Sequence, residues 1–470
     1  MKKQSKKGWF PNVYTILFVL AIAAAVLTWV IPAGSYERVT EGSVTKVVAG
    51  TYHTIEQSPQ GPWQIFQALV TGFKNQSSLI YMILFVSAAV YMMTETQAVN
   101  TTFSKLAGAV KGKEEIAIFC VMFFMSMGGA TGVFGNATLV LIPIGIFLSQ
   151  AMGFDKTLGF FMIFFGQFSG FNVGWANAGV LGVAQSIAEV PLFSGFSARV
   201  IFHAVNFALS YGFVLLYLRQ LRKDPTMSLN YEPGMAISEV MGSQSGKDSM
   251  GDSSITRVQA LTMLCMCGGL IAIIIGALKF KWGADKISAT FLVVCLLIGC
   301  VSCRDMNVAF DRFIKGCSTG VSAAFIVGFA NALTVLMNDG KIMDTIVYYL
   351  AKPVEYAGPV LGAGLMFFAN ALINFFISSG SGQAAAVMPI MVPIADLAGI
   401  TRQVAVQAFQ FGDGFTNCMI PTIGTLMGGL GFAGISYGKY LKKAVPLILI
   451  QVVLAFFTLM LLQSIGWTGL

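Results

Sequence analysis

The hydrophobic and polar residues of this chain alternate on a long scale, with extended apolar runs separated by short polar segments. Runs with almost no charge are long enough, or nearly so, to cross a hydrocarbon core of roughly 30 Å as helices. They occupy residues 13–31, 79–93, 197–218, 258–278 and 444–462. Two shorter segments, 63–72 and 308–316, place apolar residues at helical spacing beside polar ones. This pattern predicts helices that lie at the membrane interface.

Composition supports the same interpretation. Hydrophobic residues make up 56% of the 470 positions and charged residues 11%, whereas soluble domains are about a quarter charged. The first run is not a signal peptide, because no small-residue cleavage site follows it and further spans do. The sequence therefore predicts an all-α polytopic membrane protein in contact with the lipid bilayer.

The net charge of +8 indicates orientation in the membrane rather than nucleic-acid binding. Basic residues cluster at 2–7, 105–113 and 219–223, each beside the end of a predicted span. The positive-inside rule places these clusters, and the N-terminus, in the cytoplasm and the C-terminus outside. Lys279, Lys281 and Lys286 fall on the external side and are an exception, which Asp285 partly offsets. We expect the chain to lie in the cytoplasmic (inner) membrane of a bacterium.

Motifs for cofactors are absent from the sequence. The eight cysteines lie mostly in apolar runs without CxxC or Cys/His ligand spacing, so we expect neither a metal site nor a disulfide. No P-loop or other ATP site is visible. The sequence predicts no cofactor. Na⁺ or H⁺ remains the candidate coupling ion.

An internal repeat organises the chain. Met-Phe-Phe at 122–124 recurs at 366–368, an offset of 244 residues, and Phe-Gly at 165–166 recurs at 411–412, an offset of 246. Matches in the same order over most of each half predict two copies of one structural unit.

The copies are separated by one extra span. We predict a first repeat at 1–222, a cytoplasmic linker at 223–257, a connecting transmembrane helix at 258–278 and a second repeat at 279–470. The linker is rich in Ser and Gly in its second half, which is typical of a flexible loop. A single extra crossing inverts the second copy relative to the first, and inverted repeats are typical of secondary transporters.

Each copy contains two interruptions of apolar sequence. Ser-Ser-Gly-Ser-Gly-Gln at 378–383 breaks an apolar segment, and the first copy has a matching break near 130–138. Unwound backbone survives in a membrane only inside protein or beside water, so we predict re-entrant hairpins with these segments as their tips. Broken helices near 166–179 and 411–424 follow the two hairpins.

The breaks offer groups for binding. A helix that restarts near Gln383 directs free N–H groups and its positive end at the tip, which suits a carboxylate, and freed carbonyls suit a cation such as Na⁺. Polar and glycine residues of the breaks are the candidate site residues: Asn136, Thr138, Asn172, Asn177, Ser378, Ser379, Gly380, Ser381, Gly382, Gln383, Asp413, Asn417 and Thr422.

Alternatives remain for these features. The small residues could serve only close helix packing. An intramembrane carboxylate such as Asp413 is usually functional, but it could instead cap a helix beginning at Gly414. Ser379 or Ser381 could be the nucleophile of an intramembrane hydrolase, with His53 or His203 as its base. A GxGxxG at 429–434 follows no strand and is discounted.

Four stretches carry a resemblance to a known family: "SSGSGQAAAVMPIM", "RQVAVQAFQFGDGFTN", "GVAQSIAEVPLFSG" and "TWVIPAGSY". They resemble the YfcC family of basic amino acid antiporters, related to the C4-dicarboxylate anaerobic carriers of the ion transporter superfamily, over nearly the whole chain. The resemblance implies a scaffold domain, a mobile transport domain holding both hairpins, a homodimer and elevator-like movement. By the same matching, these residues would line the site: Ser379, Ser381, Gln383, Asp413 and Asn417.

The chain departs from that family at the first tip. Members commonly carry Gly-Glu-Glu there, whereas this chain has Gly135-Asn136-Ala137, and Glu189 stands where the family usually has glycine. We expect a non-enzymatic secondary transporter, an antiporter or a Na⁺- or H⁺-coupled symporter, for a small carboxylate-bearing solute. An amino acid such as arginine or ornithine is the first expectation, and a C4-dicarboxylate or another organic anion is the alternative.

Overall fold

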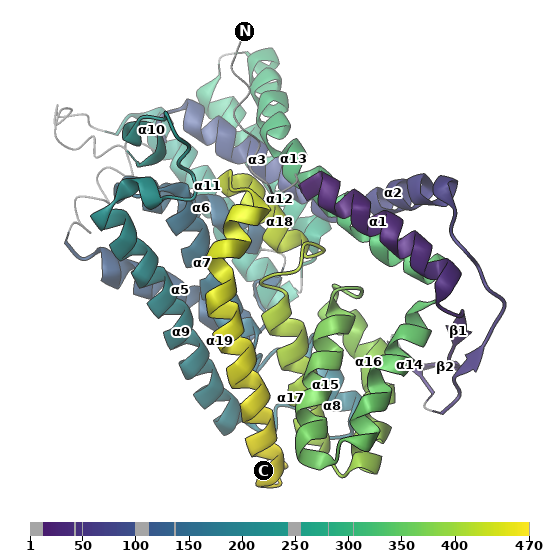
Figure 1. Ribbon diagram of the computed structural model, residues 1–470. Coiled ribbons are helices and arrows are strands. Elements are labelled where there is room, and N and C mark those ends of the chain that lie inside the picture. The colour runs from purple at the N-terminus through teal and green to yellow at the C-terminus, as the bar shows by residue number, and fades with distance from the viewer. Residues whose placement is uncertain are drawn as a thin grey trace.

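A computed structural model describes most of the chain (Figure 1). The described residues are 13–41, 44–48, 50–98, 112–135, 138–242, 255–280, 282–303 and 305–469. The described chain is nearly all helical, as the apolar runs predict. The basic clusters at 2–7 and most of 105–113 lie outside it, so the predicted orientation rests on sequence alone.

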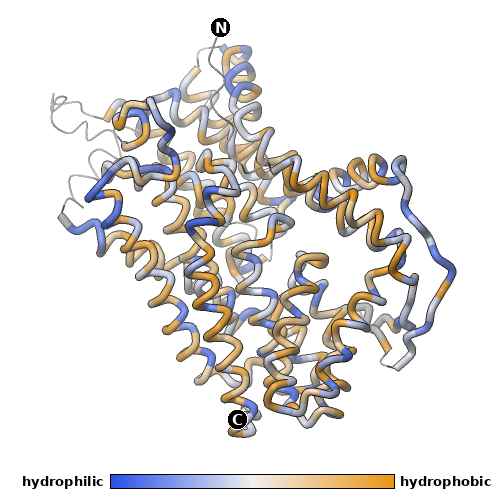
Figure 2. Tube along the Cα trace, in the orientation of Figure 1, coloured by the Kyte–Doolittle hydropathy of each residue, from blue (hydrophilic) through white to orange (hydrophobic). Residues whose placement is uncertain are grey.

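Several helices have the length and composition to cross a membrane. The described residues include six of them: α3 (Ser77–Glu95), α9 (Phe196–Lys223), α12 (Ala284–Ser302), α13 (Met306–Asp339), α16 (Gly380–Ala398) and α19 (Tyr437–Ser464). Apolar residues run along most of the helices (Figure 2). The predicted spans at 13–31 and 258–278 coincide with α1 (Val13–Val30) and α11 (Arg257–Phe280). The multi-pass membrane class is thereby confirmed.

One of the two predicted interfacial helices is wrong. Residues 63–72 form a separate helix, α2 (Pro62–Asn75), which stops at Gln76. Residues 308–316 instead begin α13, a continuous helix of 34 residues and about 51 Å. Its glycines do not break it, because Gly316 packs on Ala88 of α3, where a Cβ would lie 2.6 Å from the Ala88 Cα.

The same order of elements occurs twice along the chain. Two consecutive helices are followed by a buried helix, a break, a short helix and a long apolar helix. In the first half these are α5 (Glu114–Ala130), α6 (Thr138–Ala151), α7 (Lys156–Phe171), α8 (Leu181–Ile187) and α9. In the second half they are α15 (Pro359–Asn374), α16, α17 (Arg402–Thr416), α18 (Gly424–Ala433) and α19. The inverted relation of the halves stays a prediction.

The central helices of the two halves, α7 and α17, are the most deeply enclosed. Every residue from 157 to 170 and from 403 to 416 is buried. Glycines allow this packing, because a Cβ at Gly170 would collide with the Ser126 carbonyl of α5. The close-packing alternative therefore explains part of the glycine content of the predicted breaks.

Short strands are an addition to the predicted all-α fold. Between α1 and α2, β1 (Gly34–Ser35) pairs antiparallel with β4 (His53–Thr54), and β2 (Arg38–Glu41) pairs with β3 (Val44–Val47). Arg38 binds both carboxylate oxygens of Asp344 at 2.8 Å, which holds this segment against α14 (Met343–Tyr356).

The first part of the linker is packed against the helices rather than free. It contains η2 (Pro225–Met227) and α10 (Ile237–Val240). The hydroxyl of Ser228 donates to buried Asp155 at 2.5 Å, and the Gly242 amide donates to the Phe154 carbonyl at 3.0 Å. Residues 243–254, where the flexible loop was predicted, lie outside the described residues.

Candidate functional site

The second hairpin tip is shorter than the sequence predicts. Residues 375–379 connect the end of α15 to the start of α16, and α16 begins at Gly380. The expected unwinding of Gly380–Gln383 is wrong, because Ser379 caps the helix and accepts from the Gly382 amide at 3.3 Å. The first four N–H groups of a helix need no intrahelical acceptor, so Gly and Ser are tolerated there.

Asp413 lies inside α17, three residues before the helix ends at Thr416. The alternative that it caps a helix beginning at Gly414 is therefore wrong. Its side chain is 0% exposed, and its Oδ2 has no hydrogen-bond partner among the described residues. The Asn417 amide approaches its Oδ1 at 3.4 Å. A buried carboxylate with so few donors is costly to keep ionised, which is typical of a functional group.

The start of α16 lies directly beside this carboxylate. A Cβ built on Gly380 would be 3.0 Å from Oδ2 of Asp413 and equally close to Val180 of the first half. The positive end of the α16 dipole is thus next to the negative side chain of α17. A ligand carboxylate at this helix terminus would compete with the Asp413 carboxylate unless a cation or proton accompanied it.

Asn374 links the end of α15 to the end of α17. Its Nδ2 lies 2.9 Å from the Asp413 carbonyl oxygen and 2.8 Å from both Thr416 Oγ1 and Asn417 Oδ1. An amide group has two hydrogens, so three oxygens compete for them. The arrangement places more acceptors than donors at the centre of the site.

Further unpaired acceptors surround this centre. Gln383 donates to the Asn370 carbonyl at 2.9 Å, which joins α16 to α15. The side-chain oxygens of Asn370, Asn374 and Gln383 are buried, and within the described part of the chain they have no partner. Such oxygens suit a ligand that brings donors or positive charge, namely an ammonium group, a proton or Na⁺. No cluster of three or more His, Cys, Asp or Glu that could hold a metal occurs in the described ranges.

The first hairpin tip is described only in part. Asn136 lies outside the described residues. Thr138 is the first residue of α6, fully buried, with an Oγ1 that lacks a partner among the residues described. Asn177 accepts from the amides of Gly179 and Val180 at 3.1 and 3.2 Å, so it shapes the chain just before α8.

The break of the first half meets the helix that carries Asp413. Asn172 follows the last residue of α7, and a Cβ at Gly414 would collide with its Cα. Asn177 also contacts the first tip, because a Cβ at Gly132 would meet its side chain. The break at 172–180 therefore borders both the first tip and α17.

The serines of the second tip do not face Asp413 in this structure. Ser379, Ser381 and Gly382 are exposed and Ser378 is half-buried, whereas Asp413 is fully enclosed. Thr422 donates to the Phe375 carbonyl at 3.2 Å and supports the connection leading to the tip. The structure thus gathers Gly380, Gln383, Asp413 and Asn417 around the α15–α17 crossing and leaves the serines at its outer edge.

Three residues of the site were missed in the sequence. Asn370, Asn374 and Thr416 supply contacts at its centre. The signal was available for two of them, because Asn370 and Asn374 are four residues apart and share one face of an otherwise apolar helix.

The two histidines are engaged elsewhere. Trp175 Nε1 donates to Nδ1 of His203 at 2.8 Å, so Nε2 carries the hydrogen and donates to Ser126 at 2.6 Å. Exposed His53 lies against the Thr51 carbonyl. The hydrolase alternative gains no support, because neither ring contacts Ser379 or Ser381.

Glu189 lies at the surface, paired with an arginine. It is 76% exposed and pairs with Arg402 at 2.8 Å, and Arg402 also pairs with Asp396 at 2.8 Å. Its carboxylate is therefore engaged by the guanidinium of Arg402.

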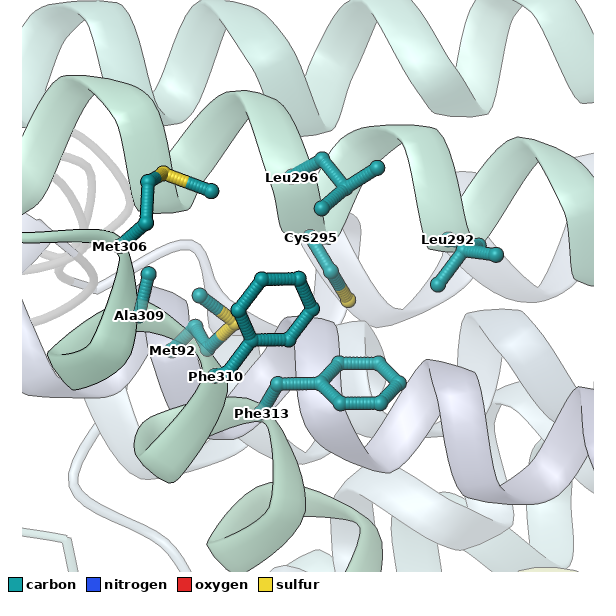
Figure 3. Close-up of a pocket in the computed structure, with 8 residues that line it drawn as sticks. All are labelled: Met92, Leu292, Cys295, Leu296, Met306, Ala309, Phe310 and Phe313. Atoms are coloured by element: carbon teal, nitrogen blue, oxygen red, sulfur yellow. The ribbon is translucent and has the colours of Figure 1, made fainter.

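A hollow in the described part of the chain lies apart from these residues. It lies between α3, α12 and α13, and its lining within the described chain is entirely apolar (Figure 3). The residues that line it are Met92, Leu292, Cys295, Leu296, Met306, Ala309, Phe310 and Phe313. It has no group that could bind a polar solute.

Sequence comparison places the chain among known transporters. The profile of the C4-dicarboxylate anaerobic carriers, DcuC, matches residues 10–464. The chain belongs to this family. The carrier is 26% identical over 485 aligned positions to the Escherichia coli (strain K12) protein named "Putative basic amino acid antiporter YfcC", covering 95% of each chain. It is 25% identical to an uncharacterized protein of Haemophilus influenzae, again over 95% of each.

Solved structures resemble the carrier more distantly. The YdaH transporter of Alcanivorax borkumensis is 18% identical, with a TM-score of 0.41, and covers 98% of this chain and 100% of its own. MtrF of Neisseria gonorrhoeae is 17% identical, with the same TM-score, over 97% and 95%. The family and the membrane-spanning helices together make the carrier a multi-pass secondary transporter.

Proposed function

We propose that this carrier transports an amino acid, by exchange or together with Na⁺ or H⁺. The position of Asp413 carries the proposal. Its side chain is fully buried beside Gly380, the first residue of α16, and its Oδ2 has no hydrogen-bond partner among the described residues. An α-amino group would pair with Asp413, and the adjacent α-carboxylate would accept from the free N–H groups of Gly380 and Ser381. Both charges of a zwitterion are thereby matched by neighbouring groups.

Arginine and ornithine are the first substrates to test. The name of the relative YfcC describes it as an antiporter of basic amino acids. A cationic side chain needs acceptors of its own, and the unpaired oxygens of Asn370, Asn374 and Gln383 supply them in place of the two glutamates missing at the first tip. Neutral amino acids form the comparison set.

A C4-dicarboxylate is the second candidate, because the chain belongs to the family named for these substrates. Two carboxylates would meet the positive end of α16 beside Asp413, so a proton or Na⁺ would have to neutralise Asp413 during binding. The two candidates therefore predict opposite effects of removing the Asp413 charge.

The proposal includes the architecture that the resemblance implies. In it, 1–222 and 279–470 are inverted repeats, and the hairpins with the buried helices α7 and α17 form a mobile transport domain. A separate scaffold domain supports elevator-like movement of this unit, and the protein is a homodimer. The enclosure of α7 and α17 supports a compact moving unit, because such a unit needs a core of its own.

The test is a ligand panel on the purified protein and on Asp413→Asn. Melting is followed with arginine, ornithine, neutral amino acids and C4-dicarboxylates, in Na⁺ and in K⁺ buffer. A ligand at 100 times its Kd stabilises the folded state by about 2.7 kcal/mol. We expect amino acids to stabilise the wild type and to have little effect on Asp413→Asn.

Stabilisation of Asp413→Asn by dicarboxylates at least as strong as that of the wild type would replace the amino acid proposal by the dicarboxylate one. Ser379→Ala and Ser381→Ala test the hydrolase alternative, because a carrier should lose affinity by degrees. A complete loss of hydrolytic chemistry in either variant, with ligand binding intact, would support the hydrolase instead.

A further inference from the structure

Arg199 is a fully buried arginine near the start of α9. Its side chain is 0% exposed, and it forms no ion pair with any described residue. Its Nε donates to Gln407 Oε1 of α17 at 2.6 Å, and its Nη1 donates to the Ser194 carbonyl. The ring of Trp467 covers one face, with its centroid 5.5 Å from Cζ. A guanidinium stays charged, so a full positive charge is enclosed here, and no carboxylate of the described residues matches it.

The edge of the guanidinium formed by Nε and Nη2 is only half satisfied. This edge can hold both oxygens of a carboxylate in a planar fork. Gln407 provides one oxygen to Nε, while Nη2 has no partner among the described residues. The other end of the same amide, Gln407 Nε2, is a second buried donor that lacks a described partner. Two donors and one net positive charge therefore share a single buried location.

We propose that Arg199 and Gln407 form a binding site for a small monovalent anion, a halide or the carboxylate of a small acid. The anion accepts from Nη2 of Arg199 and Nε2 of Gln407 and neutralises the buried charge. Gln407 has nearly the shape of glutamate, so exchange of its amide nitrogen for oxygen would create an ion pair with Arg199 inside the protein.

The site is separate from the one around Asp413. Gln407 precedes Asp413 by six residues of α17, about 9 Å along the helix axis. The proposed site lies beneath the C-terminal segment, because Trp467 covers Arg199. The Gly195 amide holds the same segment by donating to the Gly469 carbonyl at 2.7 Å. Ser194 and Trp467 are only partly buried, so the site is one layer of side chains below the surface.

The proposal is tested with the melting midpoint of the purified protein in matched sodium salts. Chloride and acetate are compared with gluconate, whose bulk keeps it out of a buried site. We expect the wild type to melt at least about 2 °C higher in chloride or acetate. The comparison of these two salts identifies whether a halide or a carboxylate is preferred.

Substitution of Gln407 provides the decisive control. Gln407→Glu places a carboxylate on the guanidinium edge, so its midpoint should be the same in the three salts. Gln407→Met has similar size and no charge but lacks the Nε2 donor, so it should weaken the dependence on chloride or acetate without supplying a carboxylate. Glu189→Gln removes a counter-charge from exposed Arg402 and should leave the response of the wild type unchanged.

Equal midpoints of the wild type in the three salts would overturn the proposal, whether or not the variants fold. A response of Gln407→Glu equal to that of the wild type would do the same, because general salt effects on the surface would then explain it. Loss of the response in Arg199→Gln would support the site independently.

Discussion

Asn374 reaches the last turn of α17, where one amide nitrogen lies within 2.9 Å of three oxygens. Asp413 stands next to this contact with Oδ2 unpaired among the described residues. At the scale of single residues, the centre of the site has an excess of acceptors and a buried negative charge. It is therefore prepared for a ligand that carries hydrogens or positive charge.

Removing the Asn374 amide tests how much this contact stabilises the site. Asn374→Ala removes the described donor of the Asn417 side-chain oxygen and one of two donors to the Asp413 carbonyl, so we expect a loss of about 2 to 4 kcal/mol in the free energy of unfolding. Thr422→Ala removes one hydrogen bond of 3.2 Å and should cost about 1 kcal/mol. Thermal and denaturant unfolding of both variants measure the difference. Equal losses would indicate that Asn374 is an ordinary packing residue.

At the scale of elements, glycines set the distance between the buried helices. A Cβ on Gly412 would lie 2.6 Å from the Asn370 Cβ and 2.9 Å from the Ala371 backbone nitrogen. The α15–α17 crossing therefore depends on the absence of a side chain, and the same crossing positions Asn374 against Asp413. Packing and binding use the same residues, so close helix packing and function are not exclusive explanations of these glycines.

Gly412→Ala is expected to separate α15 from α17 and to destabilise the protein by about 1 to 3 kcal/mol through overpacking. The control is Gly212→Ala in α9, where a Cβ would meet nothing within 4 Å. It should be neutral or stabilising by up to about 1 kcal/mol, because alanine favours a helix over glycine. Melting midpoints distinguish the variants, and a harmless Gly412→Ala would disprove the role of this crossing.

At the scale of the whole molecule, the linker joins the two halves. Asn230 accepts from the Thr157 amide and hydroxyl at 3.1 and 2.7 Å, and it donates to the Ala433 carbonyl at 2.7 Å. Thr157 lies in the first turn of α7 in the first half, and Ala433 ends α18 in the second. One linker side chain thus connects the ends of two helices that are more than half the chain apart.

Asn230→Ala should lower the free energy of unfolding by about 2 to 3 kcal/mol, because three hydrogen bonds are lost between the halves. The matched control is Glu232→Gln in the same segment, where the exposed pair with Lys439 at 3.9 Å contributes little. Substrate affinity should be unchanged in both variants, as measured by the melting shift with ligand. A reduced affinity in Asn230→Ala would mean that the linker also acts on the binding site.

The amino-acid sequence alone determined the features that depend on local pattern. Charge-free runs identify membrane helices, because the cost of burying charge applies to each segment independently. The breaks after Phe171 and Thr416 fall in the predicted segments, since Gly, Asn and Thr weaken a helix locally. The sequence predicted helix boundaries less well. Gly380–Gln383 is helical because the Ser379 cap outweighs the low helix propensity of Gly and Ser in a first turn.

Only the tertiary structure decided which polar groups meet. Asp413 is buried within α17 beside Gly380, and Arg199 of α9 donates to Gln407 of α17. Both arrangements depend on contacts between segments far apart in the chain. The continuity of α13 across Gly316 was decided in the same way, because that glycine packs against α3 instead of ending the helix. Hydropathy and propensity describe each segment in isolation, whereas a binding site consists of the contacts that packing creates between segments.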